Sequence, residues 1–259
     1  MSTETTWQEQ ITPGRFAGKT IIVTGAGSGI GQATALRIAK EGGKVIAADI
    51  SAERLDALIN EHPTLDLLPV AGDITSEEVV AKVIAATQGT VHGLANVAGI
   101  MDKFEPIHEI QDSTWERVFN VNVTSILRLS RAVVPLMLAA GTGSVVNIAS
   151  EAGIRGSAAG VAYTASKHAV VGITKNSAVM YAKAGLRFNA VAPGATITNI
   201  EAPMDSVHAQ QVLGPIMGAI IPTPVAAHEL AASITFLLSD DGTNLNGVIL
   251  PSDGGWSAI

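Results

Sequence analysis

A tyrosine and a lysine stand four residues apart, at Tyr163 and Lys167, in a stretch of mostly small residues, AYTASKHAV. If the stretch is helical, both side chains lie on one face, because positions i and i+4 are neighbours on a helix. A free phenol titrates at about pH 10, and a nearby ammonium group favours the phenolate and lowers its pKa. Such a tyrosine could exchange a proton with a carbonyl or alcohol oxygen as a general acid or base.

A serine that could hold the same oxygen closes an earlier apolar run, GSVVNIAS, at Ser150. Each of these three residues, taken alone, has a simpler explanation. Ser150 could cap a helix, Tyr163 could be a half-buried core aromatic, and Lys167 could be a solvated surface charge. Together with the glycine-rich turn described next, they favour the catalytic interpretation.

In the stretch VTGAGSGIGQA, Gly25, Gly29 and Gly31 form the pattern G-x-x-x-G-x-G after a β-rich run and before a helical pattern. Glycine permits a tight turn and lets the backbone approach a diphosphate. The N-terminus of the helix then offers free N–H groups and the positive end of a dipole. A glycine triplet alone is a weak signal, but this position indicates a dinucleotide site that includes Ser28 and Ile30.

Two acidic residues end the next two predicted strands, Asp49 and Asp73. A carboxylate at Asp49 could accept hydrogen bonds from the adenosine ribose and would repel a 2′-phosphate. Neither Ser28 nor Ile50 is a lysine or arginine that could neutralise that phosphate, so NAD is predicted over NADP. Asp49 could also cap the following helix. Asp73, followed by Ile74, could meet the adenine amino group or cap a helix at Ser76.

The elements that must position these residues are short apolar runs alternating with helical patterns. This alternation predicts a parallel sheet covered on both faces, and such sheets bind ligands at the carboxyl ends of their strands. No linker or repeat divides the chain. We therefore expect a single doubly wound Rossmann-type α/β domain with a seven-stranded parallel sheet. The predicted strands are 19–26, 44–50, 65–74, 93–99, 143–150, 187–194 and 247–255, and the predicted helices are 31–43, 51–62, 76–89, 112–141, 160–185 and 225–240.

The chain resembles the short-chain dehydrogenase/reductase family in its compact form, over residues 17–259. One departure from the family pattern is Val97, where the family often has asparagine, but Asn96 is retained. The matching residues, in family order, are TGAGSGIG (24–31), Asp73, NVAG (96–99), Asn122, Ser150, Tyr163, Lys167, Pro193 and Gly194.

The resemblance implies a catalytic tetrad of Asn122, Ser150, Tyr163 and Lys167, with a nicotinamide cofactor that supplies or accepts a hydride. Lys167 would also reach the nicotinamide ribose, and Tyr163 would contact the cofactor as well. Asn122 would hold a water molecule linked to Lys167. The resemblance further implies a homotetramer. The remaining cofactor positions that it implies are Asn96, Ala98, Gly99, Pro193, Gly194, Ile197 and Thr198.

The segment 195–224 is expected to be long, irregular and mostly apolar, and long ordered loops are often lids. It predicts a pocket for a hydrophobic or medium-sized ketone or secondary alcohol. Arg155 could meet an acidic substrate or lie on the surface. The residues predicted to contact substrate are Met101, Ile154, Met204 and His208.

Composition excludes several function classes. The chain has 259 residues, a net charge of -7, 47% hydrophobic residues and no cysteine. The acidic balance argues against a nucleic-acid or anionic-membrane surface, and the lack of cysteine excludes disulfides and thiolate catalysis. The six histidines show no metal-binding spacing, so no metal is predicted. Neither a membrane span nor a signal peptide is recognised, so residues 1–16 are interpreted as a tail and the protein as cytoplasmic.

The favoured function is an NAD-dependent oxidoreductase that transfers a hydride between nicotinamide and a ketone or secondary alcohol, with Tyr163 as general acid/base. A 3-oxoacyl-thioester reductase is a second possibility, which Asp49 and the acidic balance disfavour. A non-redox lyase or epimerase remains open. A redox-silent dinucleotide-binding regulator would be expected to lack Tyr163 or Lys167.

Overall fold

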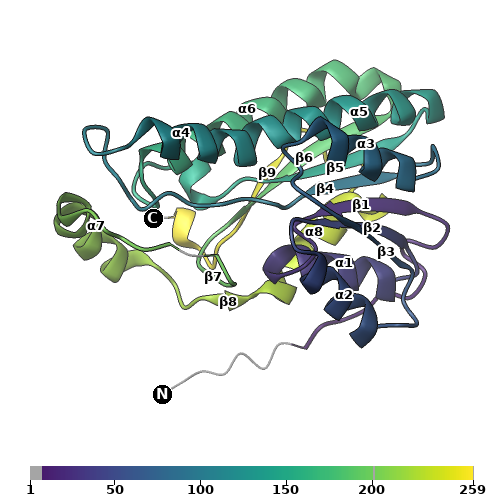
Figure 1. The fold of residues 1–259 in the computed structure, drawn as a ribbon, viewed down its shortest axis with the longest axis horizontal. Coiled ribbons are helices and arrows are strands. Elements are labelled where there is room, and N and C mark those ends of the chain that lie inside the picture. The colour runs from purple at the N-terminus through teal and green to yellow at the C-terminus, as the bar shows by residue number, and fades with distance from the viewer. Residues whose placement is uncertain (1–7, 201, 259) are drawn as a thin grey trace.

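Seven parallel strands form the centre of the protein in a computed structural model that describes residues 8–200 and 202–258 (Figure 1). Their order across the sheet is β3-β2-β1-β4-β5-β6-β9. The sequence prediction of a doubly wound seven-stranded parallel sheet is therefore confirmed. The strands are β1 (Thr20–Thr24), β2 (Lys44–Asp49), β3 (Leu67–Ala71), β4 (Gly93–Asn96), β5 (Gly143–Ile148), β6 (Leu186–Pro193) and β9 (Ile249–Ser252).

Helices cover both faces of this sheet, which is why the central strands are apolar throughout rather than alternating. One core cluster joins β1 and β2 to residues such as Ile38, Leu55 and Ile234, and a second joins the other face to Val80 and Leu129. Figure 1 shows the two helical layers on opposite sides of the sheet. The first layer is α1 (Gly29–Lys40), α2 (Ala52–Glu61) and α8 (Ala227–Leu238), and the second is α3 (Glu77–Ala86), α4 (Asp112–Phe119), α5 (Ser125–Ala140) and α6 (Val161–Tyr181).

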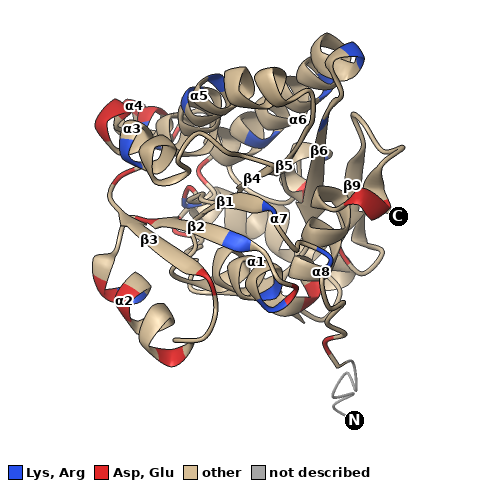
Figure 2. Cartoon of the chain, turned by 90° about the vertical axis from the view of Figure 1, so that its right-hand side faces the viewer, with Lys and Arg blue, Asp and Glu red and all other residues tan. Residues whose placement is uncertain are grey.

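Charged residues lie mainly on the outer helices and the loops, with basic and acidic side chains interspersed in the view of Figure 2. Pro69 lies inside β3, where it weakened the sequence signal for a strand. It is tolerated there because β3 is an edge strand that pairs with β2 alone among the described strands.

The segment 195–224 is more regular than expected. A short strand β7 (Thr196–Ile197) pairs with β8 (Val225–Ala226), and the helix α7 (Val207–Ile220) lies between them. Ser206 caps this helix by accepting a hydrogen bond from the amide of Ala209 at 3.0 Å. The prediction of an irregular segment was wrong because Pro215, which lies inside the helix, and its flanking glycines obscured the helical pattern.

Asp112–Ala140 is one continuous helical stretch, in which a π-turn, η1 (Asn120–Thr124), joins α4 to α5. By length and composition this stretch is long and apolar enough to cross a membrane, which the sequence analysis did not recognise. Leu129, Val133 and Met137 are fully buried in the cluster beside the sheet, as expected for a core helix of a doubly wound domain.

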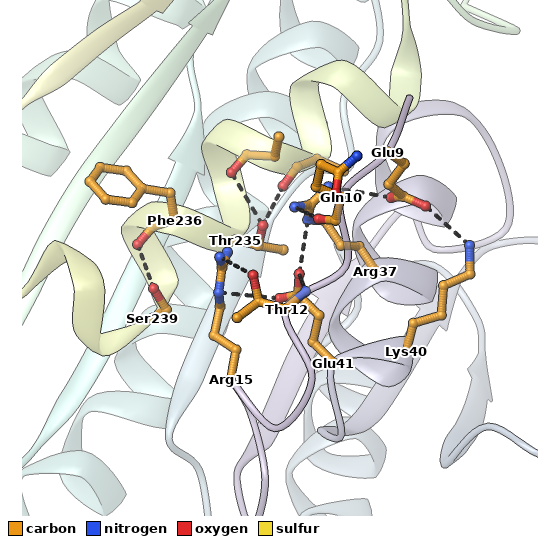
Figure 3. A network of polar contacts seen from close by, with 12 residues as sticks. Glu9, Gln10, Thr12, Arg15, Arg37, Lys40, Glu41, Thr235, Phe236 and Ser239 are labelled. Atoms are coloured by element: carbon orange, nitrogen blue, oxygen red, sulfur yellow. Dashed lines mark hydrogen bonds and ion pairs between the residues drawn. The ribbon is translucent and has the colours of Figure 1, made fainter. Parts of the chain in front are cut away.

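The described part of the N-terminal segment packs on the protein's own helix α1 (Figure 3). Phe16 is fully buried, the amide of Thr12 donates to the Glu41 carboxylate at 3.1 Å, and Arg37 donates to the Gln10 carbonyl at 2.6 Å. Glu41 itself is fully buried. The domain therefore begins before residue 17, while residues 1–7 of the predicted tail lie outside the described residues.

Candidate active site

Tyr163 lies in the first turn of α6 and is 9% exposed. The Ser150 hydroxyl, which follows the end of β5, lies near enough to the Tyr163 phenol to lower the pKa of the phenol. The same serine oxygen accepts a hydrogen bond from the amide of Ala152 at 3.1 Å, which fixes its position. The end of β5 thus brings a hydroxyl to the phenol, as the sequence predicted.

Lys167 lies one helical turn after Tyr163 and is 3% exposed. Its Nζ donates to the carbonyl of Ile148 at 2.8 Å and lies 5.4 Å from the centre of the Tyr163 ring. The predicted i, i+4 arrangement therefore places the ammonium and the phenol on the same face of α6. The contact with Ile148 also ties this face of the helix to the end of β5.

The pKa values of Tyr163 and Lys167 differ from those expected from the sequence, which predicted a lowered pKa for the phenol. Burial raises the pKa of Tyr163 to about 12, the hydrogen bond from Ser150 opposes this, and the charge of Asp102 adds to it. Burial lowers the pKa of Lys167 to about 8. The predicted lowering of the phenol pKa does not appear in the protein alone, because desolvation outweighs the hydrogen bond from Ser150, and Lys167 is not among the groups that shift this pKa. Near neutral pH the pair is a protonated phenol beside an ammonium group.

Asn122 is fully buried in the π-turn, a distortion often found at functional sites. Its Oδ1 accepts from the amide of Ile100, and its Nδ2 donates to the carbonyl of Ile100, each at 2.9 Å. Nδ2 also reaches Ser166 Oγ at 3.1 Å. Asn122 thus connects the loop after β4 to α6. A side chain at Gly99 would lie 3.3 Å from Asn122 Oδ1 and 3.5 Å from Lys167 Nζ, so glycine leaves room beside both.

A trough of about 540 Å³ runs along the carboxyl ends of β1, β2 and β4. It opens at the N-terminus of α1, where the Ser28 side chain does not cap the helix and leaves the first N–H groups open. A Cβ atom at Gly31 would lie 2.0 Å from the carbonyl oxygen of Gly25, so only glycine fits there. Of the predicted residues, those that line the trough are Gly25, Ser28, Gly29, Ile30, Gly31, Asp49, Asp73, Ile74, Ala98, Gly99, Met101 and Thr198.

Asp49 is 6% exposed, and its carboxylate is held by three donors. The amides of Gly27 and Ser51 donate at 2.9 Å each, and Arg54 Nη2 donates at 2.7 Å. The sequence analysis missed Arg54, which also lines the trough. The sequence feature that could have indicated Arg54 as a partner of Asp49 is its position in the first turn of α2, five residues after Asp49. A cation therefore stands beside the acidic residue on which the prediction of NAD over NADP rests.

Other predicted cofactor residues take different places. Asn96 is 3% exposed and does not line the trough; its Nδ2 donates to Asn147 Oδ1 at 2.8 Å, in a chain that links β4, β5 and α6. Pro193 ends β6, and Gly194 follows the strand and packs closely on Asp253. Ile197 is 68% exposed in β7. These assignments remain predictions.

Thr24, which begins the matching TGAGSGIG stretch but was assigned no role from the sequence, fixes the backbone of the NVAG stretch. Thr24 Oγ1, at the end of β1, accepts from the amides of Val97 and Ala98 at 2.9 and 3.1 Å.

An apolar cluster surrounds Tyr163. Met101 and Met204, both predicted to contact substrate, pack against it. Ile154 and His208 are exposed and do not belong to the cluster, and His208 instead lies edge-on to His108 at 5.7 Å between ring centres. The buried members of the cluster are Phe104, Ala152, Ala158, Ala159, Tyr163, Ala209 and Trp256.

The sequence analysis did not single out Trp256, which is 5% exposed. Its indole N–H is buried without a hydrogen-bond partner among the described residues. Arg155, which was considered for an acidic substrate, forms an ion pair with Glu151 and donates to the Trp256 carbonyl at 2.6 Å. These contacts hold the C-terminal turn against the segment after Ser150. In the described part of the chain no group of three or more His, Cys, Asp and Glu residues could hold a metal ion.

The family model described as short chain dehydrogenase matches residues 19–208. Together with the sheet order and the Ser150–Tyr163–Lys167 geometry, this match shows that the chain belongs to the short-chain dehydrogenase/reductase family. The family comprises oxidoreductases that bind a nicotinamide nucleotide, NAD or NADP.

Three relatives illustrate the similarity. Levodione reductase from Leifsonia aquatica is 38% identical, over 94% of this chain and 96% of the relative. A crystal structure of levodione reductase gives a TM-score of 0.84 at 35% identity, covering 94% of this chain and 99% of that one. 3beta-hydroxysteroid dehydrogenase 2 from Eggerthella lenta is 39% identical, over 94% of this chain and 96% of the relative. A crystal structure of a candidate NAD(P)-dependent gluconate 5-dehydrogenase from Beutenbergia cavernae, with NADP bound at low occupancy, gives a TM-score of 0.82 at 35% identity. It covers 96% of this chain and 100% of that one.

Proposed function

We propose that this protein is an NAD(H)-dependent oxidoreductase that interconverts a ketone and a secondary alcohol, with Tyr163 as the general acid/base. The observation that carries the proposal is the buried contact of Ser150 with the Tyr163 phenol, with Lys167 on the same helix face, beside the glycine-lined trough.

The residues of the trough fit a dinucleotide. The open N-terminus of α1 suits a diphosphate, and the space left by Gly31 and Gly25 lets the backbone approach it. When bound, a nicotinamide cofactor supplies or accepts the hydride at the reacting carbon. The cofactor residues predicted from the sequence are proposed on this basis, including those outside the trough lining.

In this reaction Ser150 holds the substrate oxygen and Tyr163 gives it a proton during reduction, or removes one during oxidation. The ammonium of Lys167 favours the negative charge that develops on the phenol as its proton leaves. Asn122 acts by fixing Ile100 and Ser166 around Lys167, since its amide is already bonded to both. The protonated phenol near neutral pH suits the reductive direction.

NAD is proposed over NADP because Asp49 presents a carboxylate at the end of β2, where the adenosine ribose would lie. Arg54 limits how strict this preference is, since it pairs with Asp49 and could meet a 2′-phosphate. The NADP found with one structural relative supports testing both cofactors.

A hydrophobic ketone or secondary alcohol of medium size is the proposed substrate class. The apolar cluster around Tyr163 supports it, and so do the levodione reductase and hydroxysteroid dehydrogenase among the relatives. Met101 and Met204 are the proposed contacts from the two flanking segments. Ile154 and His208 would have to move toward Tyr163 to take part.

We propose a cytoplasmic homotetramer. The outer faces of α5 and α6 carry exposed apolar side chains, namely Leu127, Leu138, Val179 and Met180, which burial against another copy would cover. Sedimentation that finds only monomer at micromolar concentration would exclude this assembly.

A panel of ketones and alcohols, assayed with NADH and NADPH in parallel, tests the proposed function directly. Ketone-dependent oxidation of NADH is expected. Conversion of a substrate without net cofactor turnover would favour a lyase or epimerase, and nucleotide binding without any conversion would favour a regulator. Turnover restricted to 3-oxoacyl thioesters with NADPH would favour the thioester reductase.

A further inference from the structure

Asp102 is a buried carboxylate beside the catalytic helix that the proposed mechanism does not use. It lies in the loop after β4, is 1% exposed, and borders the nucleotide trough. Burial raises its pKa, and the hydrogen bonds from the backbone oppose this rise. A buried carboxylate is costly unless it is well bonded, so the bonds that it accepts explain why it is present.

These bonds come from the two segments that shape the substrate side. Asp102 Oδ1 accepts from the amides of Gly160 and Phe104 at 3.1 Å each. Oδ2 accepts from the amide of Tyr163 itself at 2.9 Å. Gly160 begins α6, so the carboxylate caps the catalytic helix from another part of the chain. A Cβ atom at Gly160 would lie 2.6 Å from Asp102 Oδ2, so glycine makes the approach possible.

Phe104 shows that this arrangement holds a strained backbone. It is a buried aromatic with a φ of 60°, in the left-handed region that residues with a bulky side chain rarely adopt. Its amide is bonded to Asp102, and its ring belongs to the cluster around Tyr163. One carboxylate thus fixes both the start of α6 and a buried aromatic of the apolar cluster around Tyr163.

The negative charge of Asp102 also acts on Tyr163. The Asp102 carboxylate opposes ionisation of the Tyr163 phenol, and Lys167 is the cation on the same helix face. Glu105 in turn acts on Asp102. The other titratable groups on the elements packed around Tyr163 are Lys103, Glu151, Arg155, Asp205, His208 and Asp253, of which Lys103 pairs with Asp205 and Arg155 with Glu151.

We propose that Asp102 is a positioning residue for the reaction: it holds the first turn of α6 and Phe104 in one arrangement, and its negative charge keeps the proton on Tyr163 until the substrate oxygen takes it. This proposal rests on the proposed function, because it assigns Asp102 a part in the proton transfer by Tyr163.

Asp102→Asn tests the proposal, because it removes the charge and keeps a side chain of the same shape. Because Lys167, with a pKa of about 8, loses its proton before Tyr163, whose pKa is about 12, the alkaline side of the pH profile of kcat for ketone reduction has a first step from Lys167 and a later step from Tyr163. The later step is the limb that reports the phenol, and it should move to lower pH by about one unit, the size of effect that one nearby charge produces. A capping role alone would lower the stability or kcat without moving the limb. An unmoved limb would therefore overturn the proposal, whatever happens to kcat.

A second measurement, the phenolate fraction of Tyr163, does not depend on enzyme turnover. The chain has two tyrosines, so Tyr181→Phe leaves Tyr163 as the single tyrosine, and ¹³C labelling of its ring reports the phenolate fraction by NMR. Asp102→Asn in this background should give a larger phenolate fraction at the highest pH at which both proteins stay folded. Equal fractions would contradict the proposal. If wild-type protein turns over no substrate, the proposed function fails while this reading still tests Asp102.

Matched variants keep the result interpretable. If Asp102→Asn does not fold, Asp102→Ser retains an acceptor of the kind preferred at helix N-termini and also lacks the charge, so the same shift is expected. Ser239→Ala removes a buried capping hydroxyl far along the chain, after α8. It should lower the melting temperature and leave the pH profile in place. A shift of the profile in Ser239→Ala would show that destabilisation alone moves it, and would overturn the proposal.

Discussion

Arg54 donates to the Asp49 carboxylate across 2.7 Å at the rim of the nucleotide trough. The acidic residue on which the proposed preference for NAD rests is therefore paired with a cation, the Arg54 guanidinium, whose side chain is 43% exposed. Under the proposed function, cofactor selection depends on both of these neighbouring groups.

The first prediction concerns this pair. Asp49→Ala should weaken NADH binding about tenfold and narrow the difference between NADH and NADPH, because the ribose loses a charged acceptor. Arg54→Ala should weaken NADPH binding by a similar factor and leave NADH nearly unchanged. Titration of both cofactors against each variant measures this. Equal losses for both cofactors in Arg54→Ala would mean that the arginine acts only by holding Asp49.

The second prediction tests the general acid/base. Tyr163→Phe should lower kcat by at least about a hundredfold, because the phenyl ring cannot exchange a proton with the substrate oxygen. NADH binding should persist, since the trough lining is untouched. Stopped-flow or steady-state rates and a cofactor titration are needed together. Retention of more than about a tenth of the wild-type kcat would remove Tyr163 from its assigned role.

The third prediction follows from the buried lysine. Burial lowers the pKa of Lys167 to about 8, whereas an unfolded lysine titrates at about 10.4. Between these values the unfolded chain binds more protons than the folded protein, so the contribution of Lys167 to stability rises with pH. The free energy of unfolding of wild type relative to Lys167→Met should therefore increase by about 2 kcal/mol from pH 7 to about pH 9.5.

Tyr163 acts in the opposite direction at higher pH. Its pKa is raised to about 12, so above about pH 10 the folded protein holds a proton that the unfolded chain has lost, and stability falls. Urea unfolding of both proteins, kept below about pH 10, isolates the lysine. Parallel pH dependences for wild type and Lys167→Met would contradict the pKa assigned to Lys167.

The fourth prediction concerns the glycine turn. Gly31→Ala places a methyl group 2.0 Å from the Gly25 carbonyl, so the turn must open. We expect a loss of at least about 2 kcal/mol of stability and of measurable nucleotide binding. Gly172→Ala is the matched control, because nothing lies within 4 Å of the added methyl group and alanine favours a helix by up to about 1 kcal/mol. A fully bound nucleotide in Gly31→Ala would contradict the proposed site.

The sequence was sufficient for the parts of the protein that depend on local pattern. Apolar runs between helical stretches predicted the seven strands, and the spacing of Tyr163 and Lys167 predicted their shared helix face. The position of Ser150 directly after a predicted strand indicated that it lies near the Tyr163 phenol, because the carboxyl ends of parallel strands meet at one edge of a sheet. These inferences need only the periodicity of an element and the direction of a chain.

Other features depend on contacts between distant parts of the chain. Asp102 and Tyr163 are 61 positions apart and meet through a backbone amide, which leaves no trace in either residue type. The Lys–Tyr spacing predicts proximity, but the desolvation that raises the pKa of Tyr163 depends on everything packed around it. Helix α7 was missed because Pro215 breaks the expected pattern, although Ser206 provides a cap for its start.

The N-terminal segment has a practical consequence for anyone who shortens this protein. The family model begins at residue 19, and a chain cut there would lose Thr12 and Arg15, two partners of the fully buried Glu41. Glu41 would keep Arg37 as an ion-pair partner, but the fully buried Phe16 would be lost with the same cut, and the loss of a buried phenylalanine side chain costs about 3–5 kcal/mol, a large part of the stability of an ordinary domain. The boundary at which homology ends is therefore not the boundary at which this polypeptide can be safely truncated.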